Sequence, residues 1–292
     1  MNNETESPIH LLSGGLDQTS IGWVKSQDSL AVGFVAYGHT KCVNGVVASP
    51  DNTHFITCSL DATLKLFSTE IPSSESQLLL AENGIEGIPA ISKLVSERKT
   101  KKTKHENSSS SNTHLIKGPK MTFSGHVGSV TSVSINSTAK NTFYSGGLDQ
   151  SIRSWDAVTG DNVSTKVCDQ AVLSIDYSAL SGLIVSGHTD KYIRIWDPRI
   201  EDSNVSSMSL GGHSKYVGAV KWSPNSPYMF SSASYDGSVK VWDVRSPNSC
   251  MYNIPPSSKT AGKLNPKLLA LDWNLGILAF GGESNQLYIQ SF

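Results

Sequence analysis

The chain has 292 residues, 24 of them basic and 25 acidic, and a formal net charge of −1. This length suits one large domain or two ordinary ones, and the near-neutral balance argues against an overall basic nucleic-acid binder. Charged residues are only 17% of the chain and glycine occurs 24 times, so turn formers are common and strong helix formers are few.

The sequence shows no sign of export or of a membrane-spanning helix. The first ten residues, MNNETESPIH, lack the basic and apolar regions of a signal peptide. The best apolar run, Leu30 to Tyr37, is far shorter than a membrane helix. No CxxC pair occurs among the cysteines, so we expect free thiols in a reducing compartment at Cys42, Cys58, Cys168 and Cys250.

A repeated segment first appears near residue 11 and recurs to the end of the chain. Five copies place an Asp six residues before an aromatic residue: Asp17/Trp23, Asp61/Phe67, Asp149/Trp155, Asp190/Trp196 and Asp236/Trp242. The same copies carry Ser or Thr four residues before the Asp, at Ser13, Thr57, Ser145, Ser186 and Ser232. A sixth copy is degenerate, with Phe280, Ser284 and Gln290. Strand-forming residues flank turn-forming residues in each copy, which predicts a β-hairpin.

Five of these hairpins follow a further segment with the alternating pattern of a half-buried strand: residues 43–48, 130–135, 172–177, 217–222 and 268–273. Three of the five segments are preceded by Gly-His, at His39, His126 and His213. The histidine then lies 22, 23 and 23 residues before the Asp of its copy.

A period of 41 to 48 residues, marked by Gly-His and Trp-Asp, resembles the WD40 repeat, a four-stranded propeller blade. The resemblance implies an all-β WD40 β-propeller with five to six recognisable blades of a family seven, and an incomplete set would leave the ring open. We expect a disordered N-terminus over 1–9, the propeller over 10–292, and a disordered basic, Ser-rich insertion over 70–118 within it.

The resemblance also implies a buried hydrogen-bonded chain in each blade, because buried polar groups need partners. Its expected members are His39, Thr57, Asp61, His126, Ser145, Asp149, Trp155, Ser186, Asp190, Trp196, His213, Ser232, Asp236 and Trp242. The set made of His39, Thr57 and Asp61 ends in Phe67, which cannot donate the last hydrogen bond. A catalytic Ser-His-Asp interpretation is rejected, because the pattern repeats around a ring and lacks a nucleophile elbow. The expected role is structural.

The insertion contains a basic run made of Arg98, Lys99, Lys101, Lys102 and Lys104. Such a run is typical of a nuclear-import signal, and it is also compatible with an RNA-backbone contact or a solvated linker.

A finer resemblance follows from residues 193–224, the run VKVWDVRSPNSCMYNI and the ending GGESNQLYIQSF. Together with the basic insertion, they resemble the Ytm-type ribosome-biogenesis family, the WD-repeat subunit of the nucleolar PeBoW assembly. The resemblance implies a non-enzymatic scaffold for 60S maturation and pre-rRNA processing. Expected partners are Pescadillo-type and block-of-proliferation (Erb-type) proteins and the pre-60S particle, in the nucleus, nucleolus and nucleoplasm. No cofactor, metal, membrane or small-molecule substrate is expected.

The sequence departs from that family in lacking a ubiquitin-like domain, a first blade and the opening strand of the second. We expect either a gene model truncated at Met1 or a fragment. In the family an AAA ATPase releases the complex by pulling on the ubiquitin-like domain, so this step cannot be carried over to the present chain.

Two groups of residues are candidates for partner binding. Lys215, Tyr216 and Tyr235 are expected on the face of the Asp turns, although such aromatics also serve in packing. Arg199 and Arg245 are expected on the opposite face, where they could pair with neighbouring acids. Both arginines occur in WDxR motifs, which resemble the docking signature of cullin-4 ubiquitin-ligase substrate receptors; this is a second hypothesis. No GxxxxGK[ST], HExxH or GxSxG motif is present.

Overall fold

The computed structural model describes residues 9–26, 29–70, 115–139, 141–200, 206–255 and 265–291. Over these ranges the chain forms 23 strands, arranged in six sheets, and no helix. Since the described ranges hold no helix at all, they hold none with the length and apolarity to cross a membrane. The predicted all-β propeller is confirmed.

The sheets follow one another along the chain. The first contains β1 (Ile9–Gly14), β2 (Ser20–Ser26), β3 (Ser29–Ala36) and β7 (Leu115–Lys117). The second contains β4 (Val43–Ala48), β5 (His54–Ser59), β6 (Thr63–Ser68) and β8 (Met121–Ser124). The third contains β9 (Val130–Ile135), β10 (Thr142–Gly147), β11 (Ser151–Asp156) and β12 (Asn162–Val167).

The remaining three sheets repeat the same meander. The fourth contains β13 (Val172–Tyr177), β14 (Ile184–His188), β15 (Ile193–Trp196) and β16 (Met208–Leu210). The fifth contains β17 (Val217–Trp222), β18 (Met229–Ser234), β19 (Val239–Asp243) and β20 (Tyr252–Ile254). The sixth contains β21 (Leu268–Asn274), β22 (Ile277–Gly282) and β23 (Leu287–Ser291).

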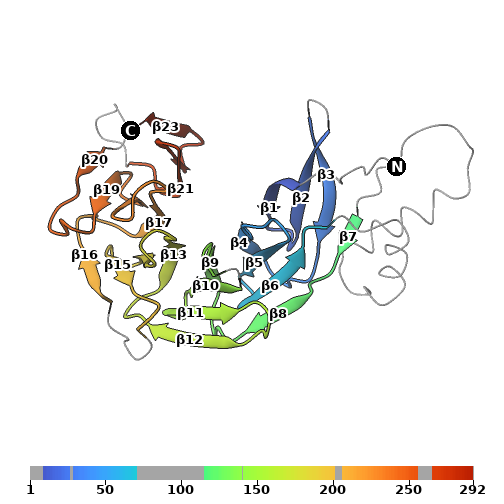
Figure 1. The fold of residues 1–292 in the computed structure, drawn as a ribbon. Helices are drawn as coiled ribbons and strands as arrows, with labels where there is room; N and C mark the ends of the chain where they lie inside the picture. The colour runs from blue at the N-terminus through green and yellow to red at the C-terminus, as the bar shows by residue number, and fades with distance from the viewer. Residues whose placement is uncertain are drawn as a thin grey trace, which may run out of the picture.

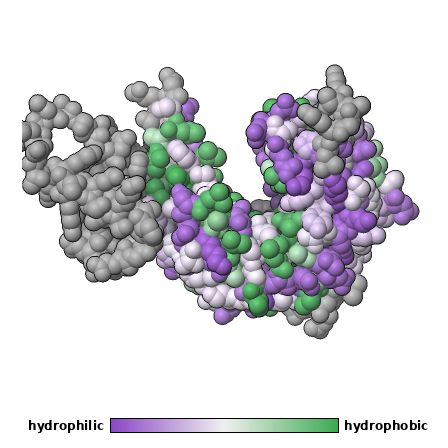
Figure 2. All heavy atoms as spheres, turned by 180° about the vertical axis from the view of Figure 1, so that it is seen from behind, coloured by the Kyte–Doolittle hydropathy of each residue, from purple (hydrophilic) through white to green (hydrophobic). Residues whose placement is uncertain are grey.

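The sheets are arranged around an arc whose inner wall is formed by β4, β9, β13, β17 and β21, each of which contacts the next. Figure 1 shows that the first and sixth sheets stand apart at the two ends of this arc. The opening between the two arms is also visible from behind in Figure 2.

Apolar residues of neighbouring sheets form the cores between them. Trp155 of the third sheet is 1% exposed and packs with Ile56 and Leu64 of the second sheet. Trp242 of the fifth sheet packs in the same way against Ile193 of the fourth. In the second to fifth sheets the aromatic residue of the repeat therefore faces the preceding sheet, and burial of its ring stabilises the contact between sheets.

The structure differs from the predicted boundaries at two points. Ile9, expected in the N-terminal segment, is the first residue of β1. Residues 115–117, expected within the insertion, form β7, which pairs in parallel with β3. A three-residue strand has too short a pattern to be recognised in a polar sequence. The rest of the insertion after Glu70 lies outside the described residues.

Candidate functional site

The third sheet contains a complete chain of buried polar groups. His126 Nδ1 lies 2.8 Å from Asp149 Oδ2, and His126 Nε2 lies 2.7 Å from Ser145 Oγ. Trp155 Nε1 donates to the same Ser145 oxygen at 2.8 Å. Because a carboxylate only accepts, the Nδ1 atom of His126 carries a proton and donates it to Asp149.

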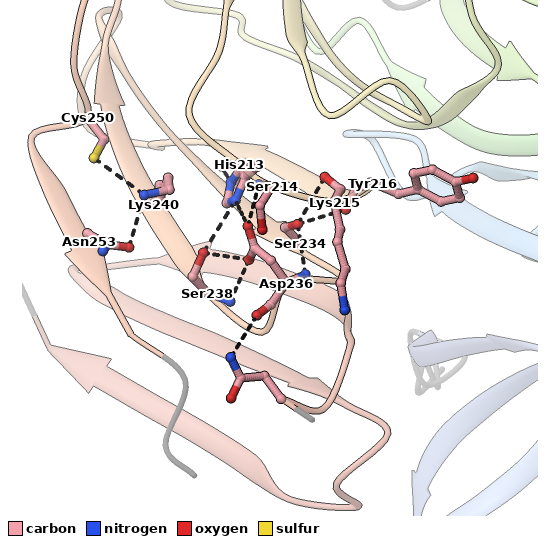
Figure 3. A network of polar contacts seen from close by, with 12 residues as sticks. His213, Ser214, Lys215, Tyr216, Ser234, Asp236, Ser238, Lys240, Cys250 and Asn253 are labelled. Atoms are coloured by element: carbon pink, nitrogen blue, oxygen red, sulfur yellow. Dashed lines mark hydrogen bonds and ion pairs between the residues drawn. The ribbon is translucent and has the colours of Figure 1, made fainter. Parts of the chain in front are cut away.

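The fifth sheet repeats this geometry, as Figure 3 shows for the part around Asp236. His213 lies 3.0 Å from Asp236 Oδ2 and 2.7 Å from Ser232 Oγ, and Trp242 Nε1 donates to Ser232 at 2.8 Å. The Asp236 carboxylate also accepts from the Ser214 backbone N–H at 2.9 Å. The aspartate thereby ties the turn between β18 and β19 to the loop that enters the sheet.

The second sheet has a shorter chain. His39 lies 2.9 Å from Asp61 Oδ2 and 2.7 Å from Thr57 Oγ1. Phe67 takes the tryptophan position and is 1% exposed, so its ring packs without donating a hydrogen bond. The Thr57 hydroxyl also lies 3.4 Å from the Lys65 carbonyl, which is an acceptor and so does not replace the missing indole donor.

The fourth sheet departs from the predicted chain. Trp196 Nε1 donates to Ser186 Oγ at 2.8 Å as in the other sheets, but the histidine at 2.8 Å from that oxygen is His188, on the same strand. Asp190, predicted to join the chain, instead binds Arg194 at 2.6 Å. The physical reason is that the loop before β13 supplies no imidazole, so the nearby guanidinium takes the carboxylate. His188 was missed, and its spacing two residues after Ser186 was the available signal.

These contacts set the ionisation of the aspartates. Burial raises the pKa of Asp149, but hydrogen bonds from His126, Ser151 and the Val127 N–H together lower it to about 2. The pKa of Asp61 is likewise about 2, because donors from Thr63, Thr40 and His39 outweigh its burial. Burial lowers the pKa of His39. The carboxylates are therefore ionised and held by several hydrogen-bond donors each.

This arrangement serves structure better than catalysis. The hydroxyl-bearing residues Thr57, Ser145, Ser186 and Ser232 are each 0% exposed, so a substrate carbonyl cannot reach them. Each hydroxyl is already held by a histidine and, in the third, fourth and fifth sheets, by a tryptophan as well. Among the residues that the model describes, no group of three His, Cys, Asp or Glu side chains is placed to hold a metal ion.

The three candidates on the Asp-turn face lie together. The rings of Tyr216 and Tyr235 are 5.8 Å apart, and the Lys267 ammonium lies 5.8 Å from the Tyr235 ring. Tyr216 is 49% exposed, and its ring extends away from the polar chain (Figure 3). Lys215 is exposed beside it. The cluster is an exposed aromatic and basic patch above the fifth sheet.

Arg199 and Arg245 lie at the opposite end of the sheets, after β15 and β19. Arg199 binds Asp197 at 2.7 Å and Arg245 binds Asp243 at 2.6 Å, as the pairing hypothesis anticipated. The guanidinium of Arg245 also lies 4.4 Å from the centre of the Tyr228 ring. The arginine side chains remain 69% and 64% exposed, whereas their partner carboxylates are 19% and 9% exposed. The basic run Arg98–Lys104 lies outside the described residues.

A series of mostly four-stranded antiparallel sheets around a common axis, with a complete His–Ser–Asp–Trp chain in the third and fifth sheets and partial chains in the second and fourth, defines a WD-repeat propeller. The chain belongs to the WD40 family: the model of the WD domain, G-beta repeat, matches residues 32–68, 117–156, 162–197 and 204–243.

Individual relatives have a narrower description. The chain is 32% identical over 287 residues to "Ribosome biogenesis protein WDR12 homolog" of Ixodes scapularis, covering 97% of this chain and 62% of that protein. It is 34% identical over 282 residues to the protein of the same name from Nematostella vectensis, covering 95% and 61%. "Ribosome biogenesis protein ytm1" of Schizosaccharomyces pombe is 30% identical over 291 residues, covering 95% and 62%. The chain thus spans about three fifths of the length of these relatives.

Proposed function

We propose that this chain is a non-enzymatic scaffold in ribosome biogenesis, acting in nucleolar maturation of the 60S subunit and in pre-rRNA processing. Its partners in this proposal are Pescadillo-type and block-of-proliferation (Erb-type) proteins, within the pre-60S particle. The observation that carries the proposal is the similarity to proteins named for ribosome biogenesis along at least 95% of the chain. The buried polar chains support a non-catalytic role, since their hydroxyls are closed to substrate.

Co-purification tests the proposal directly. The tagged chain is expressed in its own cells, and the Pescadillo-type and Erb-type proteins are quantified in the eluate together with 60S precursor rRNA. We expect both proteins and the precursor to be enriched over a tag-only control. Absence of both proteins from the eluate of a folded, nuclear chain would overturn the proposal.

The exposed guanidiniums of Arg199 and Arg245 favour a second candidate, a substrate receptor of a cullin-4 ubiquitin ligase. The double variant Arg199→Ala, Arg245→Ala separates the two functions. Loss of a ligase adaptor from the eluate, with the ribosome-assembly proteins retained, favours the receptor. If the double variant retains both the adaptor and the assembly proteins, these arginines serve neither function.

The basic run carries two further proposals, nuclear import and a pre-rRNA contact. Replacement of Arg98, Lys99, Lys101, Lys102 and Lys104 by Ser is expected to abolish nuclear accumulation of a fluorescent fusion. RNA crosslinking is expected to fall in a variant without residues 93–120. Unchanged accumulation or undiminished crosslinking would exclude the respective role.

A further inference from the structure

A leucine occupies a backbone conformation that leucine disfavours, at the tip of the β21–β22 hairpin. Asn274 pairs with Ile277, so the turn has two residues, Leu275 and Gly276, with φ of 45° and 77°. Positive φ at both positions is what a type I′ turn requires, and Asn-Gly is its preferred sequence. The side chain of Leu275 is 80% exposed, so burial does not compensate for the unfavourable φ.

No other large apolar residue in the described ranges has positive φ. The other non-glycine residues with positive φ are Gln18, Asn52, Ala62, Gln150, Lys191 and Asn285. They are polar or small, and all but Asn52 directly follow the Asp position of a repeat. Leu275 therefore combines backbone strain with an exposed apolar side chain, a combination that neither folding nor solubility favours.

The neighbouring sheets place apolar residues at the same end. Because adjacent strands are antiparallel, the first connection of each of the second to sixth sheets lies at the end opposite the Asp turns. The connection of the fourth sheet exposes 56% of Leu180, and that of the fifth sheet exposes 44% of Tyr228. The corresponding connections of the second and third sheets, residues 49–53 and 136–141, contain no large apolar residue. Among the first connections of the second to sixth sheets, those that expose a large apolar residue thus belong to three consecutive sheets, along the arm that contains β13, β17 and β21 (Figure 1).

The two arginines flank this apolar group with outward positive charge. Arg245 stacks on Tyr228 at 4.4 Å, and Arg199 follows β15 in the sheet that carries Leu180. Their carboxylate partners are shielded, at 19% and 9% exposure, while the guanidiniums are 69% and 64% exposed. Leu180 also lines a hollow of about 600 Å³ along the inner wall, together with Pro224 and Trp273. The surface therefore offers apolar anchors, a concave region and two pre-positioned cations.

We propose that Leu180, Tyr228, Leu275, Arg199 and Arg245 form a docking surface for a segment of another protein that carries apolar side chains flanked by carboxylates. Aromatic and arginine side chains are the residues that most often dominate binding energy at protein interfaces. Strain at Leu275 persists because the side chain is used in binding. A nucleic acid would use the arginines but has no need of Leu275, so a protein segment fits the surface better.

The substitution Leu275→Asn tests this surface, which deepens the proposed scaffold function and rests on it. Asn-Gly suits the turn, so the variant is expected to unfold at a temperature about 2 °C higher or more. Its affinity for the purified Pescadillo-type or Erb-type protein, measured by interferometry, is expected to fall about tenfold or more. A merely structural leucine would not lose binding while gaining stability.

The control is Val127→Asn, which removes an apolar side chain at a position that is 90% exposed, in the loop before β9 at the Asp-turn end and so away from the surface. It is expected to keep wild-type affinity. If the wild type binds and Leu275→Asn binds equally well, the docking surface is overturned while the scaffold function stands. If neither purified protein binds the wild type, the scaffold function fails and this surface with it. The double variant Arg199→Ala, Arg245→Ala is also tested with an rRNA duplex. If it binds the duplex more weakly, while it and Leu275→Asn keep their affinity for the protein partner, the site binds nucleic acid and the proposal is overturned.

Discussion

At the scale of single residues, the hydroxyl of each polar chain contacts a histidine, and in the third, fourth and fifth sheets it also accepts from an indole. Ser145 holds both His126 and Trp155, whereas Thr57 holds His39 but faces Phe67, which has no donor. The two sheets therefore differ in how many buried groups depend on one hydroxyl.

We predict that Ser145→Ala lowers the free energy of unfolding by about 2–4 kcal/mol, because it leaves both the imidazole and the indole without a partner. Thr57→Ala is expected to lower it by only about 1–2 kcal/mol, since one group alone loses its partner. Urea unfolding of the two variants beside the wild type provides the comparison. Equal losses in the two variants would contradict the linked-chain interpretation.

His188 makes stability depend on mildly acidic pH. Burial, and to a smaller extent the charge of Arg194, lower its pKa to about 4. The imidazole therefore takes up a proton near pH 6.5 in the unfolded state but only near pH 4 in the folded state. Stability contributed by the neutral imidazole is present above pH 6.5 and is lost as the pH falls through this window.

We predict that the unfolding midpoint of the wild type falls between pH 6.5 and pH 4 more steeply than that of His188→Gln, which cannot take up this proton. Differential scanning fluorimetry across this window measures both slopes. Parallel slopes in the two proteins would show that His188 is not the titrating group.

At the scale of elements, β7 is an unusual addition to the first sheet. It pairs in parallel with β3, and the Tyr37 N–H donates to the Lys117 carbonyl at 2.8 Å. The buried ammonium of Lys117 donates to the carbonyls of Ser68 and Glu70 and lies 3.9 Å from the centre of the Phe34 ring. One side chain thus joins the end of β6 to the first sheet.

We predict that Lys117→Ala speeds hydrogen exchange at Tyr37 about tenfold, because the loss of these contacts releases β7. Lys120→Ala, at an exposed position three residues later, serves as the control and is expected to leave that amide protected. Native-state exchange followed by mass spectrometry measures both, and unchanged protection in Lys117→Ala would show that strand pairing alone holds β7.

At the scale of the whole molecule, the end sheets of the arc expose apolar side chains that the inner sheets bury. Leu287 and Ile289 of β23 are 71% and 67% exposed, whereas Ile152, at the position of Leu287 in the third sheet, is 2% exposed. Figure 2 shows hydrophobic residues at the surface of the arm formed by the first sheet as well. Exposed strand edges with apolar residues favour association.

We predict that the chain self-associates at micromolar concentration, and that Leu287→Lys with Ile289→Lys lowers the associated fraction severalfold. Light scattering coupled to gel filtration measures the mass of each species. A wild-type chain that stays monomeric at the same concentration as the double variant would contradict this.

The repeat itself could be predicted in detail, because Gly-His, Asp and Trp recur at spacings that only one local geometry satisfies. The strands 43–48 and 130–135 appear where the alternation predicted them, as β4 and β9. Asp190 could not be assigned correctly, because its partner depends on whether an imidazole from a distant loop or the guanidinium of Arg194 lies closer. The exposed strain of Leu275 was equally hidden, since φ is not visible in a sequence.

The sequence by itself determined the strands and the succession of sheets, because strand periodicity and turn chemistry act locally, and its resemblance to the WD40 repeat implied most members of the buried polar chains. Only the tertiary structure decided which histidine serves the fourth sheet, that residues 115–117 join the first sheet, and which exposed residues share a surface. These outcomes depend on contacts between segments far apart in the chain, such as β3 and β7, for which local preference sets no rule.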